Sequence, residues 1–200
     1  MSKGLKHKQQ RVGVFIDVQN IYYSAKALYK RKVNFDAIVQ NALAGRQLIR
    51  AFAYVIEADN KEEQSFFDAL ENLGIEVRSK KIQSFYGGRK KGDWDVGIAM
   101  DVLRLAPKLD VVVLVSGDGD FVPLVEYVQA NNGCRVEVIA FSRSASGNLQ
   151  EVSDDFLDLA AERVEDYLLY PSRSKRHHPR QEVKSESKQE AKPASQPEAK

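Results

Sequence analysis

The chain has 200 residues, a net charge of +2 and one cysteine, and 43% of its residues are hydrophobic. This length is typical of one globular domain with a good core and a tail, and it leaves too few residues for a second full domain. The lone cysteine excludes an intrachain disulfide, and no apolar segment is long enough for a signal peptide or a transmembrane helix. We therefore expect a cytoplasmic protein without a membrane partner.

Charge is distributed unevenly along the chain. Residues 1–11 hold four Lys/Arg and no acid, residues 171–200 hold eight Lys/Arg and four Glu, and residues 12–170 hold 18 basic and 24 acidic residues. We expect a basic extension over 1–11, a folded domain over 12–170 and a disordered basic tail over 171–200. Basic ends around an acidic body suit a polyanion, but a soluble acidic enzyme with a basic tail has the same pattern.

In chain order, apolar runs predict five strands, which cover residues 11–17, 47–57, 75–78, 111–115 and 135–141. Between them, helical spacing of apolar residues predicts helices over 21–30, 35–43, 61–73, 95–105 and 121–131. Residues 149–152 and 156–168 are expected to add helical or short strand segments. Strands that alternate with helices predict an α/β fold with a central, mainly parallel sheet. The fourth run is apolar throughout, as in a strand that is buried on both faces.

Acidic residues stand where these strands end. Asp17 ends the first strand, Asp118 and Asp120 follow the fourth, and Asp95 begins the helix that leads into the fourth. Because the carboxyl ends of parallel strands share one edge of the sheet, all four carboxylates are expected to meet there. An alternative is that Asp118 and Asp120 only form a turn and cap the next helix.

The neighbours of these acids have expected roles as well. Gly117 and Gly119 are expected to let the backbone turn tightly, and Asp93 is expected to be the N-cap of the 95–105 helix. Asp101 lies six residues after Asp95, which is about 600° around the helix, so one of the two acids faces the sheet edge and we expect it to be Asp95.

The ligand types indicate the chemistry. No His, Ser or Cys is placed beside these acids as a nucleophile with a base. A site made of carboxylates suits Mg²⁺ or Mn²⁺, which prefer oxygen ligands. Such sites hydrolyse phosphodiesters by orienting a metal-bound water and stabilising charge on the phosphate.

Two basic segments are candidates for nucleic-acid contact. Phe85 and Tyr86 are interleaved with cations, and such a segment suits a nucleic-acid backbone and its bases, although a solvated surface hairpin has the same composition. Residues 142–148 form a loop with hydroxyls and one arginine, which suits phosphate oxygens or serves as a plain connector. The candidate cations are Lys80, Lys81, Arg89, Lys90, Lys91 and Arg143.

Three stretches, residues 15–20, 91–101 and 114–121, together resemble the signature motifs of the NYN domain, in its LabA-like branch of the PIN-like nuclease group. The resemblance covers roughly residues 12–160. It implies a PIN-like three-layer sandwich and a metal-dependent ribonuclease, with RNA as partner and a homodimer left open. It also implies site roles for particular residues: metal-binding acids Asp17, Asp95, Asp118 and Asp120, polar lining groups Asn20 and Ser116, and a further acid, Asp101.

Two other interpretations of these motifs are open. The segment 117–120 resembles the acidic motif of haloacid-dehalogenase-type phosphatases, but those need a second Asp two residues after the first-strand Asp, and here that residue is Gln19. The second interpretation is a non-catalytic RNA-binding or regulatory module in which the same acids bind a metal structurally. Metal-dependent cleavage favours the enzyme, and RNA affinity that survives chelation favours the module.

Overall fold

The centre of the protein is a six-stranded parallel sheet. The computed structural model describes residues 6–57, 61–81, 83–84, 90–91, 93–161 and 163–169. Every neighbouring pair of strands in the sheet is parallel. In spatial order the strands are β4 (Glu76–Lys81), β3 (Gln47–Glu57), β1 (Arg11–Asp17), β7 (Val111–Val115), β8 (Arg135–Ala140) and β9 (Asp155–Asp158).

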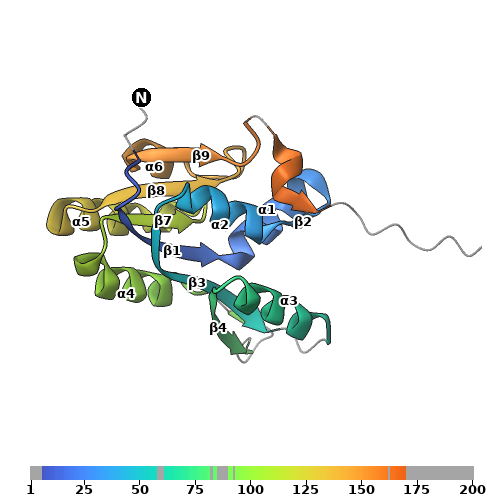
Figure 1. The fold of residues 1–200 in the computed structure, drawn as a ribbon. Helices are drawn as coiled ribbons and strands as arrows, with labels where there is room; N and C mark the ends of the chain where they lie inside the picture. Colours follow the sequence, from blue (N-terminus) through green and yellow to red (C-terminus); the bar gives the residue numbers. More distant parts are fainter. Residues whose placement is uncertain are drawn as a thin grey trace, which may run out of the picture.

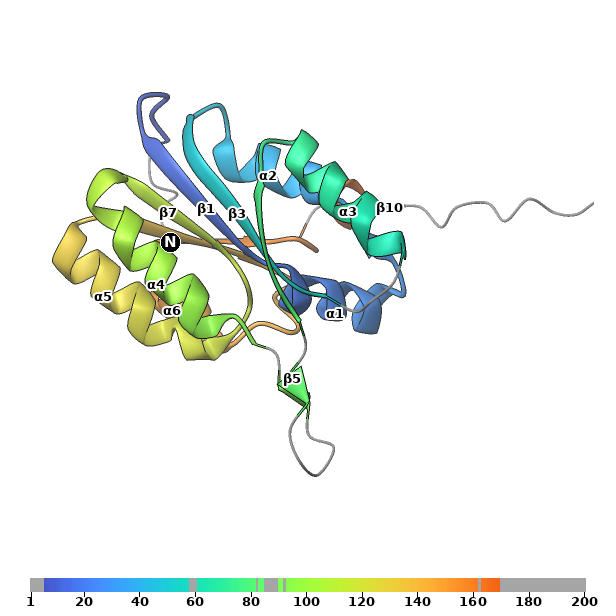
Figure 2. The same cartoon turned by 90° about the horizontal axis from the view of Figure 1, so that it is seen from below.

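Helices cover both faces of this sheet, as Figures 1 and 2 show. On one face lie α1 (Val18–Tyr29), α2 (Phe35–Leu43) and α3 (Lys61–Asn72). On the other lie α4 (Asp95–Leu105), α5 (Val122–Asn132) and α6 (Gly147–Val152). The three layers confirm the predicted PIN-like α/β sandwich with a parallel sheet.

The central strands are apolar throughout because both of their faces are buried. In β7 all five residues are buried, and alternate side chains belong to the two cores: Val113 packs with α1 and α2, whereas Leu114 packs with α4 and α5. The adjacent β1 behaves in the same way, with Ile16 in the first core and Phe15 in the second. This two-sided burial explains why the pattern in these strands is continuous rather than alternating.

One strand of the sheet was not separately predicted. β9 pairs with β8 at the edge, and its Asp158 accepts hydrogen bonds from the Ser142 amide (3.1 Å) and hydroxyl (2.5 Å). The strand Asp155–Asp158 has an acid at each end and only two apolar residues, so its sequence has no strand signal of its own. Its partner and the loop after β8 stabilise it instead.

Smaller elements complete the domain. β2 (Lys32–Val33) pairs with β10 (Leu168–Leu169), and β5 (Gln83–Ser84) pairs with β6 (Lys90–Lys91) in a hairpin that projects from the sheet in Figure 2. The 3-10 helices are η1 (Ala106–Lys108), η2 (Gly119–Phe121) and η3 (Val164–Tyr167). Within the described ranges, no helix has the length and apolar character that a bilayer crossing requires. The predicted tail over 171–200 lies outside the described residues, and so do residues 1–5 of the predicted basic extension.

Candidate metal centre

Three carboxylates converge at the carboxyl edge of the sheet. Asp95, Asp118 and Asp120 each offer one oxygen, and these oxygens all lie within 4.8 Å of one another. Asp95 is the first residue of α4, and the other two come from the turn after β7. Asp95 and Asp118 are partly buried and Asp120 is exposed. Negative charges this close repel one another, so a bound proton or a cation would stabilise the cluster.

Parallel topology explains the meeting. Helix α4 precedes β7 in the chain and runs antiparallel to it, so the beginning of α4 and the end of β7 lie at the same edge. β1 lies beside β7 with Ile16 opposite Val115, so Asp17 is next to the turn that carries Asp118. These positions follow from the order of the strands rather than from any local motif.

Asp17 lies beside this cluster as a buried acid, with 8% of its surface exposed. One of its oxygens, Oδ1, accepts a hydrogen bond from the Asn20 amide (3.1 Å) and thereby caps α1, and Oδ2 accepts from the Ser116 hydroxyl (3.3 Å). Burial, together with the charges of Asp95 and Asp118, raises the pKa of Asp17 to about 6, although both hydrogen bonds act in the opposite direction. The protein therefore holds an acid here whose ionised form is costly in the absence of a cation.

The pKa of Asp95 is raised as well. Burial is the largest cause, followed by the negative charges of Asp118, Asp93 and Asp120, while Lys80 acts in the opposite direction. A bound divalent cation would cancel the part of this pKa rise that comes from the neighbouring carboxylates, because the cation favours the ionised form of each ligand.

Asn20 and Ser116 brace the turn that carries the acids. The Gly117 amide donates to Asn20 Oδ1 (2.9 Å), and the Asp118 amide donates to Ser116 Oγ (3.2 Å). The Asp120 amide in turn donates to Asp118 Oδ1 (3.0 Å). Asn20 lies in the first turn of α1, whose N-cap is Asp17. The side chains of Asn20 and Ser116 thus position the acids by binding backbone amides of the turn.

The two glycines of this turn have a different role from the one expected. Among the described glycines, the positive-φ positions are Gly45, Gly74 and Gly133, so Gly117 and Gly119 need no left-handed backbone. A Cβ on Gly117 would lie 2.9 Å from the Ala145 Cα, and one on Gly119 would lie 2.9 Å from the Ser146 Oγ. The glycines are needed because the loop after β8 packs directly against the turn.

The start of α4 is held by an aromatic side chain that the sequence reasoning missed. Trp94 occupies the N-cap position without a capping side-chain bond, so the prediction that Asp93 is the N-cap is wrong. Instead, the Trp94 indole Nε1 donates to the Val55 carbonyl (2.7 Å), and Lys80 Nζ lies 4.5 Å from the indole centroid and donates to the Asp93 carbonyl. The sequence contains a signal for this packing, since Trp94 directly precedes Asp95 and Gly97 follows three residues later. A Cβ on Gly97 would lie 2.5 Å from the indole ring, so the ring needs a glycine at this position.

Asp101 lies outside the three-acid cluster, whereas Asp95, at the start of α4, lies within it. Its carboxylate accepts hydrogen bonds from the Tyr54 hydroxyl (3.0 Å) and from Arg104 (2.5 Å), and Arg78 lies 3.9 Å away. These partners compensate its charge, so the structure gives Asp101 a structural role between α4 and β3.

The predicted cations are only partly described. Lys80 lies against Trp94 beside the cluster, Lys81 is exposed at the end of β4, and Arg143 is exposed in the loop after β8. For Lys90 and Lys91 the structure describes the β6 backbone but not the side chains, and Arg89 lies outside the described residues.

Comparison with known proteins decides the family. The model of the NYN domain matches residues 11–160. The chain belongs to the NYN domain family. It is also 30% identical over 162 residues to the low amplitude and bright protein LabA of Synechococcus elongatus, which covers 76% of this chain and 85% of LabA. This NYN domain protein is therefore LabA-like, as its motifs predicted.

A solved structure supports the NYN fold. A protein of unknown function from Vibrio parahaemolyticus superposes with a TM-score of 0.75 at 32% identity, covering 83% of this chain and 100% of that one. The NYN domain thus has a nuclease-type fold with an acidic cluster at its carboxyl edge.

The donor set of the cluster fits a divalent cation. Asp95, Asp118 and Asp120 offer carboxylate oxygens alone, which hard cations such as Mg²⁺ and Mn²⁺ prefer over the nitrogen and sulfur ligands typical of zinc. The raised pKa values of Asp17 and Asp95 fit the same conclusion, because burial and the neighbouring negative charges make their ionised forms unfavourable until a cation compensates them.

Proposed function

We propose that this NYN domain protein is a metal-dependent ribonuclease of the cytoplasm that hydrolyses phosphodiester bonds at the carboxyl edge of its sheet. The observation that carries the proposal is the convergence of three carboxylates, whose oxygens lie within 4.8 Å of one another, beside a fourth, buried acid. Family membership supports RNA as the substrate class, and the carboxylate donors support Mg²⁺ or Mn²⁺.

The residues of the site have different roles in this proposal. Asp95, Asp118 and Asp120 would hold the ion, and the buried Asp17 is the fourth acid beside them. When bound, a divalent ion orients a water, lowers its pKa and compensates charge on the phosphate. Asn20 and Ser116 keep the turn of Asp118 in place through the Gly117 and Asp118 amides.

Cations on the rim of the site bind the RNA backbone in this proposal. Lys80 lies beside the acidic cluster at Trp94, and Arg143 is exposed in the loop that packs on the turn of the two acids. Lys81 ends β4, and Arg89, Lys90 and Lys91 belong to the segment between β4 and α4, which leads to Asp95. Such contacts position the strand without reading its sequence.

The test is cleavage of end-labelled single-stranded and hairpin RNA with Mg²⁺ or Mn²⁺, beside an EDTA control. Asp118→Asn should lower the cleavage rate at least a hundredfold, because it removes a charge that holds the ion while keeping the Oδ1 that accepts from the Asp120 amide. Asp36→Asn, an exposed acid in the first turn of α2, is the matched control and should cleave as the wild type does.

A different result would identify a different function. If RNA stays intact with either metal but is still retained by the protein, the domain is an RNA-binding module on a nuclease fold. Equal cleavage by Asp118→Asn and the wild type would mean that the activity comes from elsewhere, including a contaminant.

A further inference from the structure

A large groove lies between α1 and α3, with strands β2 and β3 at its base. Its volume is about 420 Å³, and its lining includes Val18 and Gln19 from α1, Val55 and Ile56 from β3 and Leu169 from β10. None of these residues is part of the acidic cluster. A groove of this size accommodates a small planar group or two.

One wall of the groove is a stripe of α1. Gln19, Tyr22, Tyr23 and Lys26 stand at positions i, i+3, i+4 and i+7, so they share one face of the helix. Tyr23 is 59% exposed, which is unusual for an aromatic ring in a helix that packs on a sheet. The rings of Tyr22 and Tyr23 lie 5.5 Å apart in an edge-to-face arrangement.

The other wall is aromatic as well. Phe66 and Phe67 of α3 have ring centroids 6.1 Å apart, and Phe66 also contacts Phe35 at 5.6 Å. Both phenylalanines are partly buried, and both line the groove. The groove therefore offers π faces from two helices, which suit stacking of a flat ring.

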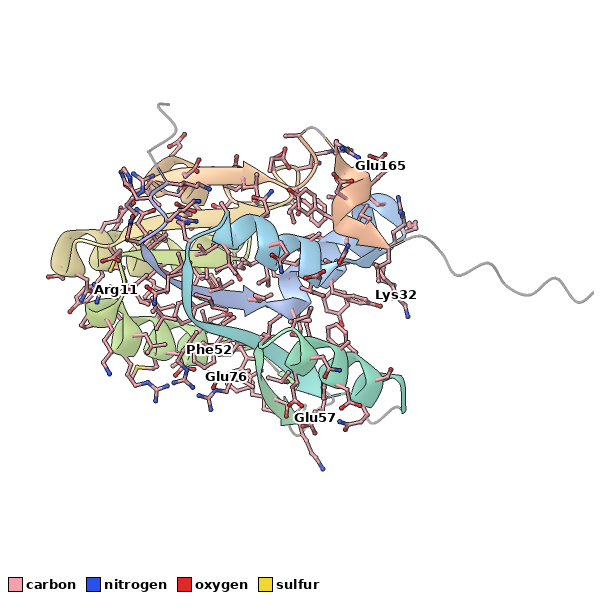
Figure 3. All side chains as sticks on the ribbon, in the orientation of Figure 1. Arg11, Lys32, Phe52, Glu57, Glu76 and Glu165 are labelled. Carbon is pink, nitrogen blue, oxygen red and sulfur yellow. The ribbon has the colours of Figure 1, made fainter. Side chains whose placement is uncertain are left out.

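The charge of the lining is positive. Lys26 Nζ lies 5.7 Å from the Tyr22 ring centroid, and Lys32 lines the groove from β2. Figure 3 shows Lys32 at the opposite end of the molecule from Arg11, which begins β1, so Lys32 is near the end where the strands finish. The described lining residues include no acid. An anionic ligand with flat rings matches this combination, whereas an acidic wall would repel it.

Residues that line the groove are neighbours, in the chain or through a hydrogen bond, of residues at the candidate metal centre. Val18 and Gln19 directly follow Asp17 in the chain. On the other side, the Val55 carbonyl accepts the hydrogen bond from the Trp94 indole, and Trp94 directly precedes Asp95.

We propose that this groove is a subsite for single-stranded RNA, in which one or two unpaired bases stack on Tyr23 and Phe67 while Lys26 and Lys32 contact the phosphates. The proposal rests on the proposed function and adds the form of the substrate, because a base can enter between α1 and α3 only when it is not paired.

The test is fluorescence anisotropy of a labelled single-stranded RNA in EDTA, so that binding is measured without cleavage. Tyr23→Ala should weaken binding about tenfold, which is about 1.4 kcal/mol, because it removes the aromatic ring on which a base stacks. Tyr23→Phe keeps the ring and should bind as the wild type does. Tyr127→Ala in α5 is the matched control, because Tyr127 is 54% exposed but lies outside the groove.

A second variant and a second probe sharpen the result. Lys26→Ala should reduce the slope of log affinity against log salt by about one phosphate contact. A duplex of the same sequence should bind equally to the wild type and Tyr23→Ala. If Tyr23→Ala binds single-stranded RNA as tightly as the wild type, or if it changes only the oligomeric mass in light scattering, the RNA subsite is refuted.

The two proposals can fail separately. Loss of binding in Tyr23→Ala together with intact RNA in Mg²⁺ and Mn²⁺ would keep the subsite and refute hydrolysis. Metal-dependent cleavage together with unchanged binding by Tyr23→Ala would keep the nuclease and refute the subsite.

Discussion

Replacing Asp17 by Asn should stabilise the protein when no metal is present. Asp17 is buried, and burial together with the charges of Asp95 and Asp118 raises its pKa from 3.8 to about 6. Asn keeps the shape, accepts the hydrogen bond from the Asn20 amide as an N-cap residue and can donate to Ser116 Oγ. The variant therefore removes the unfavourable charge and retains the local contacts.

The magnitude follows from linkage. Because the folded state holds the Asp17 proton at a higher pH than the unfolded chain, wild-type stability falls as pH rises from about 4 to about 6. A shift of about two pKa units corresponds to about 3 kcal/mol, which is the full advantage of Asp17→Asn above pH 6. At about pH 5 the advantage should be roughly half as large, and at more acidic pH it should vanish.

The assay is urea unfolding in EDTA at about pH 5 and pH 8, followed by the same measurement in Mn²⁺. The metal should raise the free energy of unfolding of the wild type more than that of Asp17→Asn, because the variant lacks one acid of the site. Asp110→Asn is a control of opposite sign, since Arg11 lowers the pKa of Asp110 and the substitution should destabilise the protein at pH 8. A less stable Asp17→Asn variant in EDTA at pH 8 would refute the cost that we assign to the buried, ionised Asp17.

Two further substitutions test the frame around the site. Gly117→Ala places a Cβ 2.9 Å from the Ala145 Cα, so it should lower the free energy of unfolding in urea by about 1–3 kcal/mol. It should also reduce RNA cleavage, because it displaces Asp118. Unchanged stability and activity would mean that the close approach is easily relieved. Arg46→Ala should cost about 3–5 kcal/mol at pH 7, because it leaves Glu137 buried without its two 2.7 Å hydrogen bonds, and thermal unfolding that matches the wild type would contradict this. Burial favours a raised pKa for Glu137 but the Arg46 bonds and the Lys6 charge lower it, so the cost should shrink as acid protonates Glu137 in the variant.

The buried strands and the acids at their ends could be predicted because both signals are local. In β7 an unbroken apolar run indicates burial on both faces, and the turn that follows it must lie at the carboxyl edge of a parallel sheet. The helical angle between Asp95 and Asp101 indicated that the two acids do not share a face, and in the structure Asp95 belongs to the cluster whereas Tyr54 and Arg104 contact Asp101.

Other features depend on partners that are distant in the chain. β9 is a strand because it pairs with β8, although its own residues have no strand pattern. The N-cap of α4 is Trp94 and not Asp93, and its indole donates a hydrogen bond to the Val55 carbonyl, 39 residues away in the chain. The sequence contains each of these residues but not the distances between them.

The amino-acid sequence by itself determined the order of strands and helices, the parallel sheet and the acids that follow its strands, because periodicity and chain topology act over short ranges. Only the tertiary structure decided how the acids differ, since Asp17 is buried and Asp120 is exposed. The Asp118 amide is bound by the Ser116 hydroxyl, and the loop after β8 packs against the turn at Gly117. It also decided the groove, because α1 and α3 become neighbours only when both pack on the same face of the sheet.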